Sequence, residues 1–189
     1  MQLERFSPAY EFRELHAINI DAPPGKVYQA LKELTAAEIS PLVSMMFELR
    51  SLPSRLIGKS AKGSFQPGPI LDQLYRRGFV FLAEAPDCEI VFGLVGRFWE
   101  PSGKIGPVLS GPEAFLAFSD PTYAKGATNF LITARDGDID CRCSTETRVY
   151  APDPRTRRKF SFYWRIISMG SGLIRILLLR AIKHKAEKM

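Results

Sequence analysis

A long amphipathic segment, residues 153–189, constrains the fold more than any other part of the chain. Its large apolar residues recur every three or four positions, which places them on one side of a helix. The resulting stripe consists of Phe160, Tyr163, Trp164, Ile167, Ser171, Ile174, Leu178 and Ile182, and it is widened by Phe162, Ile166, Leu173 and Leu177. Asp153 is a suitable N-cap, and Pro154 is tolerated in a first turn. We therefore predict one helix of about 50 Å over this segment.

Small residues interrupt this stripe near its midpoint, at Gly170-Ser171-Gly172. Two glycines cost a helix about 2 kcal/mol relative to alanine, so we predict that it bends or breaks within Met169–Gly172. The small residues also leave volume between the helix and its partner. Either a cavity opens there, or another part of the backbone approaches closely.

Alternating apolar residues and turn signals predict six strands, mostly in a meander. The strands are expected over 10–21, 78–85, 88–99, 114–118, 123–135 and 139–150. Short helices are expected over 26–34, after Ser40-Pro41 and from Ile70 to Arg77, and Asp136-Gly137 is a strong hairpin signal. Such a sheet needs its apolar face covered, and only the C-terminal helix is long enough. We therefore predict an α+β fold in which a curved antiparallel sheet wraps around that helix.

The composition predicts a single domain over residues 1–189, since 46% hydrophobic content supports a sizeable core. The N-terminus has no secretory pattern and no window reaches about 18 uncharged apolar residues, so a cytoplasmic location is expected. The net charge of +6 is concentrated in the C-terminal helix, because the chain from Pro154 onward contains ten Lys or Arg residues and one Glu. That face is either solvated or touches an anionic surface such as lipid headgroups. Nucleic acid is not expected, because no recognition signature accompanies the basic residues.

Three cysteines and two histidines give no pattern typical of a metal site. Cys141 and Cys143 alternate onto one face of a strand, and we expect the cysteines, with Cys88, to be buried and reduced. No metal and no cofactor are expected. The oligomeric state is left open.

The predicted order is a strand, two short helices, a strand meander and a long helix, and it resembles the helix-grip fold of the START-related or SRPBCC superfamily. This superfamily includes lipid-transfer domains, polyketide cyclases and the birch-pollen allergen type. The resemblance is carried by Ile18-x-Ile20-x-Ala22-Pro23 running into Val27-Tyr28-x-x-Leu31, and by Thr145–Val149 running into the long helix. It implies an apolar cavity between sheet and helix for a lipid, polyketide, sterol or other hydrophobic small molecule, and no fixed catalytic set.

Three functional hypotheses follow. The first is a binder or carrier of such a molecule, with its ligand-binding residues at Met45, Met46, Phe92, Leu94, Tyr163, Ile167, Ser171 and Ile174. The second is a cyclase or dehydratase, in which His16 acts as a base, Tyr163 donates to an enolate oxygen and Glu14 shares the inward face of the first strand.

The third hypothesis is contact with a membrane surface or a partner through the basic helix, with Leu179 exposed near Arg175 and Lys183. Glu146 and Arg148 alternate to the opposite face of their strand from the cavity. There we expect them to form cross-strand pairs.

Overall fold

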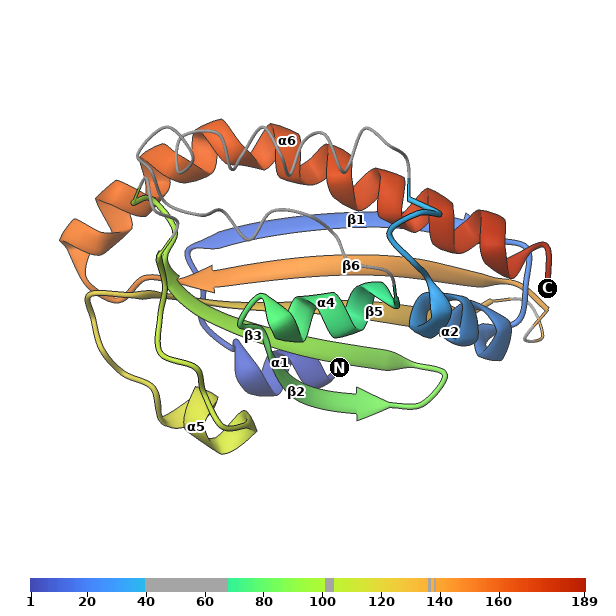
Figure 1. The fold of residues 1–189 in the computed structure, drawn as a ribbon, viewed down its shortest axis with the longest axis horizontal. Coiled ribbons are helices and arrows are strands. Elements are labelled where there is room, and N and C mark those ends of the chain that lie inside the picture. The colour runs from blue at the N-terminus through green and yellow to red at the C-terminus, as the bar shows by residue number, and fades with distance from the viewer. Residues whose placement is uncertain (40–67, 101–103, 136, 138) are drawn as a thin grey trace.

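The computed structural model describes residues 1–39, 68–100, 104–135, 137 and 139–189. In chain order the elements are α1 (Gln2–Phe6), β1 (Phe12–Ile20), α2 (Pro24–Glu33), α4 (Ile70–Arg76), β2 (Val80–Ala85), β3 (Glu89–Arg97), β4 (Lys104–Ile105), α5 (Pro112–Ala117), β5 (Ala124–Ala134), β6 (Cys141–Tyr150) and α6 (Pro154–Ala186). This is an α+β arrangement, in which one antiparallel sheet lies beneath the long helix α6 (Figure 1).

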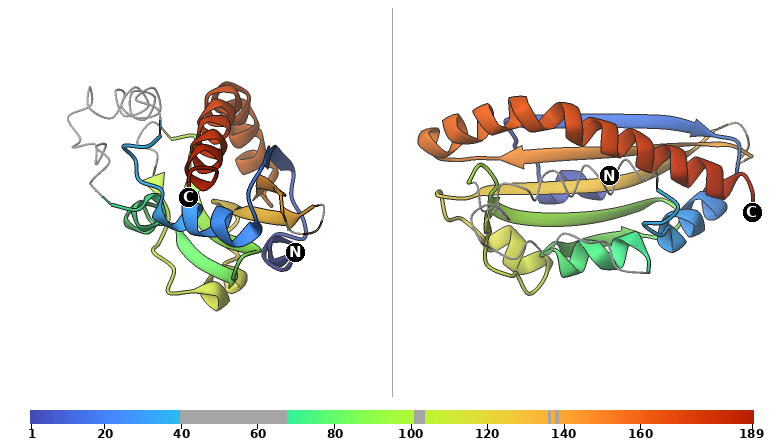
Figure 2. Two further views of the ribbon diagram at one scale, coloured as in Figure 1. Left: turned by 90° about the vertical axis from the view of Figure 1, so that its right-hand side faces the viewer. Right: turned by 45° about the horizontal axis from the view of Figure 1, so that its top comes forward.

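The sheet places the first and last strands of the chain side by side. Its strand order is β1-β6-β5-β3-β2, with β4 paired to β3 outside that order. The antiparallel register of β1 and β6 sets Phe12 opposite Val149 and Ile20 opposite Cys141. The chain then reverses after β6, so that α6 runs back over the sheet and packs mainly on β1 and α2 (Figure 2).

Five of the six predicted strands are confirmed, but the one expected over 114–118 is wrong. Those residues belong mostly to α5, which begins at Pro112. A segment this short shows no clear period, and proline suits a first helical turn. The buried ring of Phe115 lies against Gly93 of β3, where a Cβ atom would be 2.5 Å from the ring. The remaining strand of the sheet, β4, has two residues and was not predicted.

The start of α6 is as predicted. Of the bend or break predicted within Met169–Gly172, the break is wrong, because the helix is continuous there. The Asp153 carboxylate accepts a hydrogen bond from the Thr156 N–H at 2.8 Å. The helix continues for 33 residues through Met169–Gly172 and arches over the sheet (Figures 1 and 2). Buried residues anchor it on both sides of the glycines, namely Phe160 near its start and Leu179 near its end. These anchors offset the low helix propensity of glycine. Leu179, which was expected to be exposed, is only 2% exposed. The widening of the inward stripe by Phe162, Ile166 and Leu173 is wrong, because these side chains are exposed.

Apolar clusters lie on both faces of the sheet, because successive residues of β3 point to opposite sides. Ile90 and Phe92 belong to the cluster beneath α6, whereas Val91 and Val95 pack with α1 and α5. Cys141 and Cys143 are free, buried in the cluster beneath α6 and on one face, as predicted. Burial raises the pKa of the Cys143 thiol to about 12. Cys88 is exposed, so its predicted burial is wrong.

An ion-pair network centred on the buried side chains of Glu146 and Arg148 connects β1, β6 and α1 on the face of the sheet away from α6. Glu146 Oε1 lies 2.7 Å from both Arg13 Nε and Arg148 Nε, and Arg148 Nη1 lies 2.8 Å from Glu4 Oε2. Burial by itself raises the pKa of Glu146, but hydrogen bonds from the two arginines outweigh it and hold that pKa below its ordinary value. The predicted cross-strand pairing is confirmed for Glu146, which pairs with Arg13 of β1. It is wrong for Arg148, which pairs with Glu146 on its own strand and with Glu4 of α1.

Candidate functional site

Two adjoining cavities lie between α6 and the sheet. One has a volume of about 220 Å³ beneath the first half of α6, and the other, of about 260 Å³, lies further along the helix beside α4. Both are lined by Phe79, Thr128, Ile167, Ser171 and Arg175. These shared walls make the two cavities neighbouring parts of one space.

Side-chain size explains why this space remains open. Near the start of α6, Phe160 packs edge-on against Phe12 of β1, with ring centroids 4.8 Å apart. Near the other end of the helix, Leu179 and Ile182 are buried in the main core. Between these anchors the walls carry small residues, Gly170 and Ser171 on α6 and the run 126–128 on β5. Large residues therefore hold the helix away from the sheet at places where small ones do not fill the gap.

Arg175 organises a set of polar side chains at the junction of the two cavities. Its Nη1 donates to Glu14 Oε2 at 2.7 Å and to Ser171 Oγ at 2.5 Å, and its Nη2 donates to Thr147 Oγ1 at 2.8 Å. His16 Nε2 lies 2.9 Å from Glu14 Oε1, and the Thr147 hydroxyl donates to Thr128 Oγ1 at 2.9 Å. We refer to this set as the polar cluster, which consists of Glu14, His16, Thr128, Thr147, Ser171 and Arg175.

The cation of this cluster is poorly solvated. The side chains of Arg175 and Glu14 are 17% and 12% exposed. Burial lowers the pKa of Arg175 below its ordinary value, and the negative charge of Glu14 opposes that effect. The guanidinium keeps its charge near neutral pH, because an arginine starts from a pKa above about 12. The cavity wall thus carries a buried positive charge whose protein counter-ion is Glu14.

The small residues of α6 at Gly170–Gly172 both leave room for a cavity and allow a close approach of the helix to the sheet, the two alternatives expected from the sequence. A Cβ atom on Gly172 would lie 2.8 Å from Glu14 Oε1 and 3.2 Å from His16 Nε2. Glycine at this position therefore allows the helix to approach β1 closely. Ser171 and Gly170 instead line the cavities. One turn of helix serves both purposes.

Most of the predicted ligand-binding residues face these cavities. Those that line them are Leu94, Tyr163, Ile167, Ser171 and Ile174. Phe92 does not, because it is fully buried against the rings of Tyr75 and Phe81, at centroid distances of 5.7 and 6.2 Å. Met45, Met46 and the helix predicted after Ser40-Pro41 lie outside the described residues.

The three predicted catalytic candidates do not form one group. Glu14 and His16 contact each other, and neither is among the residues that line the two cavities. Tyr163 lies near the start of α6, with its ring 5.7 Å from that of Phe160. It precedes Gly172, the residue above Glu14 and His16, by nine positions, or about 13 Å along the helix axis.

Arg175, Thr128 and Thr147 were missed as site residues. A signal for Arg175 was present, since it follows Ser171 by four residues and so shares its side of the helix. A cation on a face that packs against a sheet needs a buried anion, and Glu14 was already expected to point inward. The two threonines gave no such signal, because threonine is common in strands.

No family model matches the chain, and no curated protein matches it in sequence. Among solved structures, the chain is similar to the X-ray crystal structure of protein MLL2253 from Mesorhizobium loti, with 14% identity over 92% of this chain and 98% of that chain and a TM-score of 0.40. A likeness at this TM-score supports no conclusion about function, so the candidate site depends on its own geometry.

Two other kinds of feature are absent from the part of the chain that the structure describes. Within it, no group of three His, Cys, Asp or Glu side chains is placed to hold a metal ion. Nor does any described helix combine the length and the apolar character needed to cross a bilayer.

Proposed function

We propose that the protein binds a hydrophobic small molecule in the cavities between α6 and the sheet, as a START-like or SRPBCC-type binding or carrier protein with a helix-grip fold. The main support is the unfilled apolar space at Ile167, Ser171 and Ile174, bounded by well-packed clusters at both ends of the helix. Apolar space of this kind favours apolar ligands. Ligand sites usually measure about 300 to 1,000 Å³, so the two cavities together suit a small ligand.

The geometry favours binding over acid–base catalysis. Among the described residues that line the cavities, the polar groups are hydroxyls, the indole N–H of Trp164 and the guanidinium of Arg175. An arginine is a poor general acid or base near neutral pH, because it does not release its proton. Glu14 and His16 satisfy each other behind this wall.

We also propose a cytoplasmic location. All three cysteines are free, although Cys141 and Cys143 lie two residues apart on one strand face. Unpaired thiols are typical of a reducing compartment.

Closing the space at Ser171 tests the binding proposal. Ser171→Phe should abolish the fluorescence increase of N-phenyl-1-naphthylamine, a neutral apolar probe, and lower the free energy of unfolding by about 1 to 3 kcal/mol from overpacking. Ser171→Ala is the matched control, because it removes the hydroxyl that Arg175 contacts without adding bulk. It should retain the probe. Unchanged uptake by folded Ser171→Phe would contradict the proposal.

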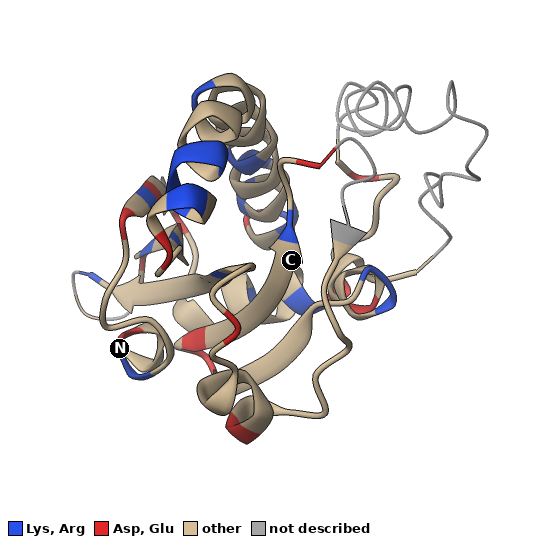
Figure 3. Ribbon diagram, turned by 90° about the vertical axis from the view of Figure 1, so that its left-hand side faces the viewer, with Lys and Arg blue, Asp and Glu red and all other residues tan. Residues whose placement is uncertain are grey.

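A second candidate function is docking on an anionic lipid surface. The outward side of α6 carries an exposed apolar row, the outer stripe, which consists of Phe162, Ile166, Met169, Leu173 and Ile176. The helix contains no Asp or Glu, and Figure 3 shows Lys and Arg along it. Its exposed cations include Arg155, Arg158, Lys159, Arg165 and Arg180. Apolar residues bordered by Lys and Arg are typical of helices that lie in the membrane interface.

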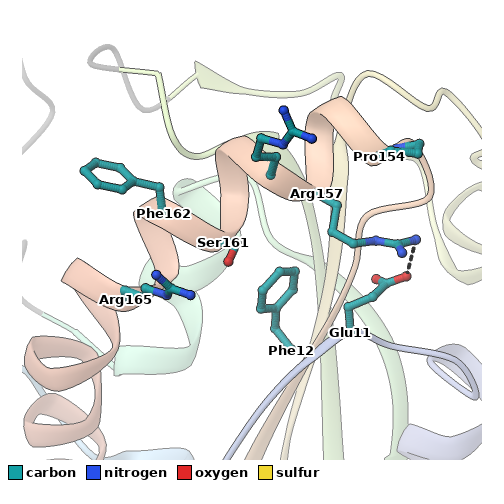
Figure 4. A pocket seen from close by; sticks show the side chains of 8 residues that line it. Glu11, Phe12, Pro154, Arg157, Ser161, Phe162 and Arg165 are labelled. Carbon is teal, nitrogen blue, oxygen red and sulfur yellow. Dashed lines mark ion pairs between the residues drawn. The ribbon is translucent and has the colours of Figure 1, made fainter.

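A surface hollow at the start of α6 adds to this basic face. Arg157, Arg158 and Arg165 line it together with Phe162 (Figure 4). Arg157 is paired with Glu11 at 2.8 Å, whereas Arg158 and Arg165 have no ion pair among the described residues. Unpaired arginines beside an exposed phenylalanine suit an anionic headgroup above acyl chains.

Vesicle sedimentation tests this second function. The protein should sediment with phosphatidylserine vesicles, less so at high salt, and not with phosphatidylcholine vesicles. The double variants Phe162→Ser/Ile166→Ser and Arg158→Gln/Arg165→Gln should both lose binding. Leu15→Ser, at an exposed leucine on the opposite face of β1, should retain it. Absence of sedimentation by the unaltered protein would exclude this function.

A further inference from the structure

We infer that the ligand is an amphipathic carboxylate, whose hydrocarbon part occupies the cavities and whose carboxylate is bound by Arg175 within the polar cluster. This inference rests on the proposed binding function and specifies the class of molecule. Its starting point is the uneven character of the wall: Arg175 is the one charged residue among the described residues that line the cavities. A purely apolar ligand would leave that cation facing hydrocarbon, which is costly.

The polar cluster presents more donors than acceptors to the cavity. Arg175 has five N–H donors, and three of its hydrogen bonds go to described protein groups. Two N–H groups therefore have no partner among the described residues and are left for a ligand. Ser171 and Thr128 each accept a hydrogen bond from within the cluster, and neither donates its own hydroxyl hydrogen to a described residue. A ligand group at this position must accept hydrogen bonds.

The position of Glu14 explains why one added negative charge fits. Glu14 binds Arg175 through Oε2 and His16 through Oε1, and it lies outside the cavity lining. Among the described residues of the polar cluster, the other charged or titratable groups are thus Glu14 and His16 on β1. A carboxylate on the cavity side would meet Arg175 and the hydroxyls first. Charge-assisted hydrogen bonds from a guanidinium are about twice as strong as neutral ones.

Other head groups satisfy the polar cluster less well. An alcohol brings a further donor to a site that already has spare donors, and an ester carbonyl accepts without a charge. A phosphate monoester brings about two negative charges to one arginine that already has Glu14 as its partner. A carboxylate has about four acceptor positions and one charge, so it matches the two remaining N–H groups and the two hydroxyls.

Three ligands with the same hydrocarbon chain test the inference: dodecanoate, methyl dodecanoate and dodecan-1-ol, measured by displacement of N-phenyl-1-naphthylamine. Dodecanoate should bind the unaltered protein at least 10-fold more tightly than the ester or the alcohol. Arg175→Met should weaken dodecanoate binding at least 10-fold and leave the ester unchanged. Arg142→Met, at an exposed arginine of β6, is the control and should leave both unchanged.

Because Arg175→Met leaves Glu14 without its cation, the double variant Glu14→Gln/Arg175→Met provides a second test in a protein with no unpaired buried charge. This double variant should also bind dodecanoate at least 10-fold more weakly and bind methyl dodecanoate with unchanged affinity. Equal binding of acid and ester, or full dodecanoate affinity in the double variant, would overturn this inference and leave the proposed function standing. If neither the probe nor any of the three ligands binds, the proposed function fails and the inference fails with it.

Discussion

Replacing Gly172 by alanine tests whether α6 is held against β1 at the polar cluster. The new Cβ atom would lie 2.8 Å from Glu14 Oε1, 3.2 Å from His16 Nε2 and 3.3 Å from His16 Cε1. The first distance is shorter than a Cβ atom tolerates, so the Glu14 carboxylate must move. That carboxylate is held by His16 at 2.9 Å and by Arg175 at 2.7 Å. Moving it breaks or stretches at least one of these contacts.

Two opposing effects set the size of the change. Alanine is better than glycine in a helix interior by about 1 kcal/mol. A hydrogen bond to a charged group contributes about 1.5 to 3 kcal/mol, so the loss of one outweighs the gain in helix propensity. We expect Gly172→Ala to lower the free energy of unfolding by about 1 kcal/mol, although helix propensity alone predicts a rise.

Urea unfolding followed by far-UV circular dichroism measures this change, and a second background shows its cause. In Glu14→Ala/Arg175→Met the obstructing carboxylate and its cation are absent. Gly172→Ala should there become stabilising, by about 1 kcal/mol. A stabilising effect of Gly172→Ala in the otherwise unaltered protein would refute the close approach as the reason for glycine.

Three further predictions concern the rest of the fold. Glu146→Gln should lower the free energy of unfolding by about 3 kcal/mol at pH 7. The folded-state pKa of Glu146 lies below its ordinary value of 4.5. The difference in unfolding free energy between the two proteins should therefore persist above pH 4.5 and shrink as the pH falls through the folded-state pKa. Urea titrations at several pH values measure this difference. In the native protein, Ellman's reagent should modify Cys88 rapidly and leave the buried Cys143 unmodified, whereas in denaturant it should modify all three thiols. Rapid modification of two thiols in the native protein would contradict the observed burial of Cys141 and Cys143. Gly93→Ala should lower the thermal midpoint, because its Cβ atom would overlap the buried ring of Phe115, and Gly93→Ala/Phe115→Leu should recover part of the loss.

Local patterns in the sequence were sufficient for most of the secondary structure. The 3.6-residue period of α6 extends over nine turns, and its N-cap at Asp153 is a local hydrogen bond, so both could be read without knowledge of the fold. The strands were predicted equally well where alternation ran for six residues or more. The segment 114–118 was too short for its period to be recognised, and it became part of α5.

For the candidate site too, local sequence patterns predicted some residues, and only the fold determined the others. The helix stripe identified Ile167, Ser171 and Ile174 as facing the sheet, because helical spacing fixes which residues share a side. The continuous course of α6 through its glycines depended instead on packing at both ends of the helix. Arg175 meets Glu14 across 161 positions in the sequence, and no local pattern encodes a contact between residues so far apart. Only the folded sheet, which places β1 beside β6 and beneath α6, brings the two charges together at the wall of the cavities.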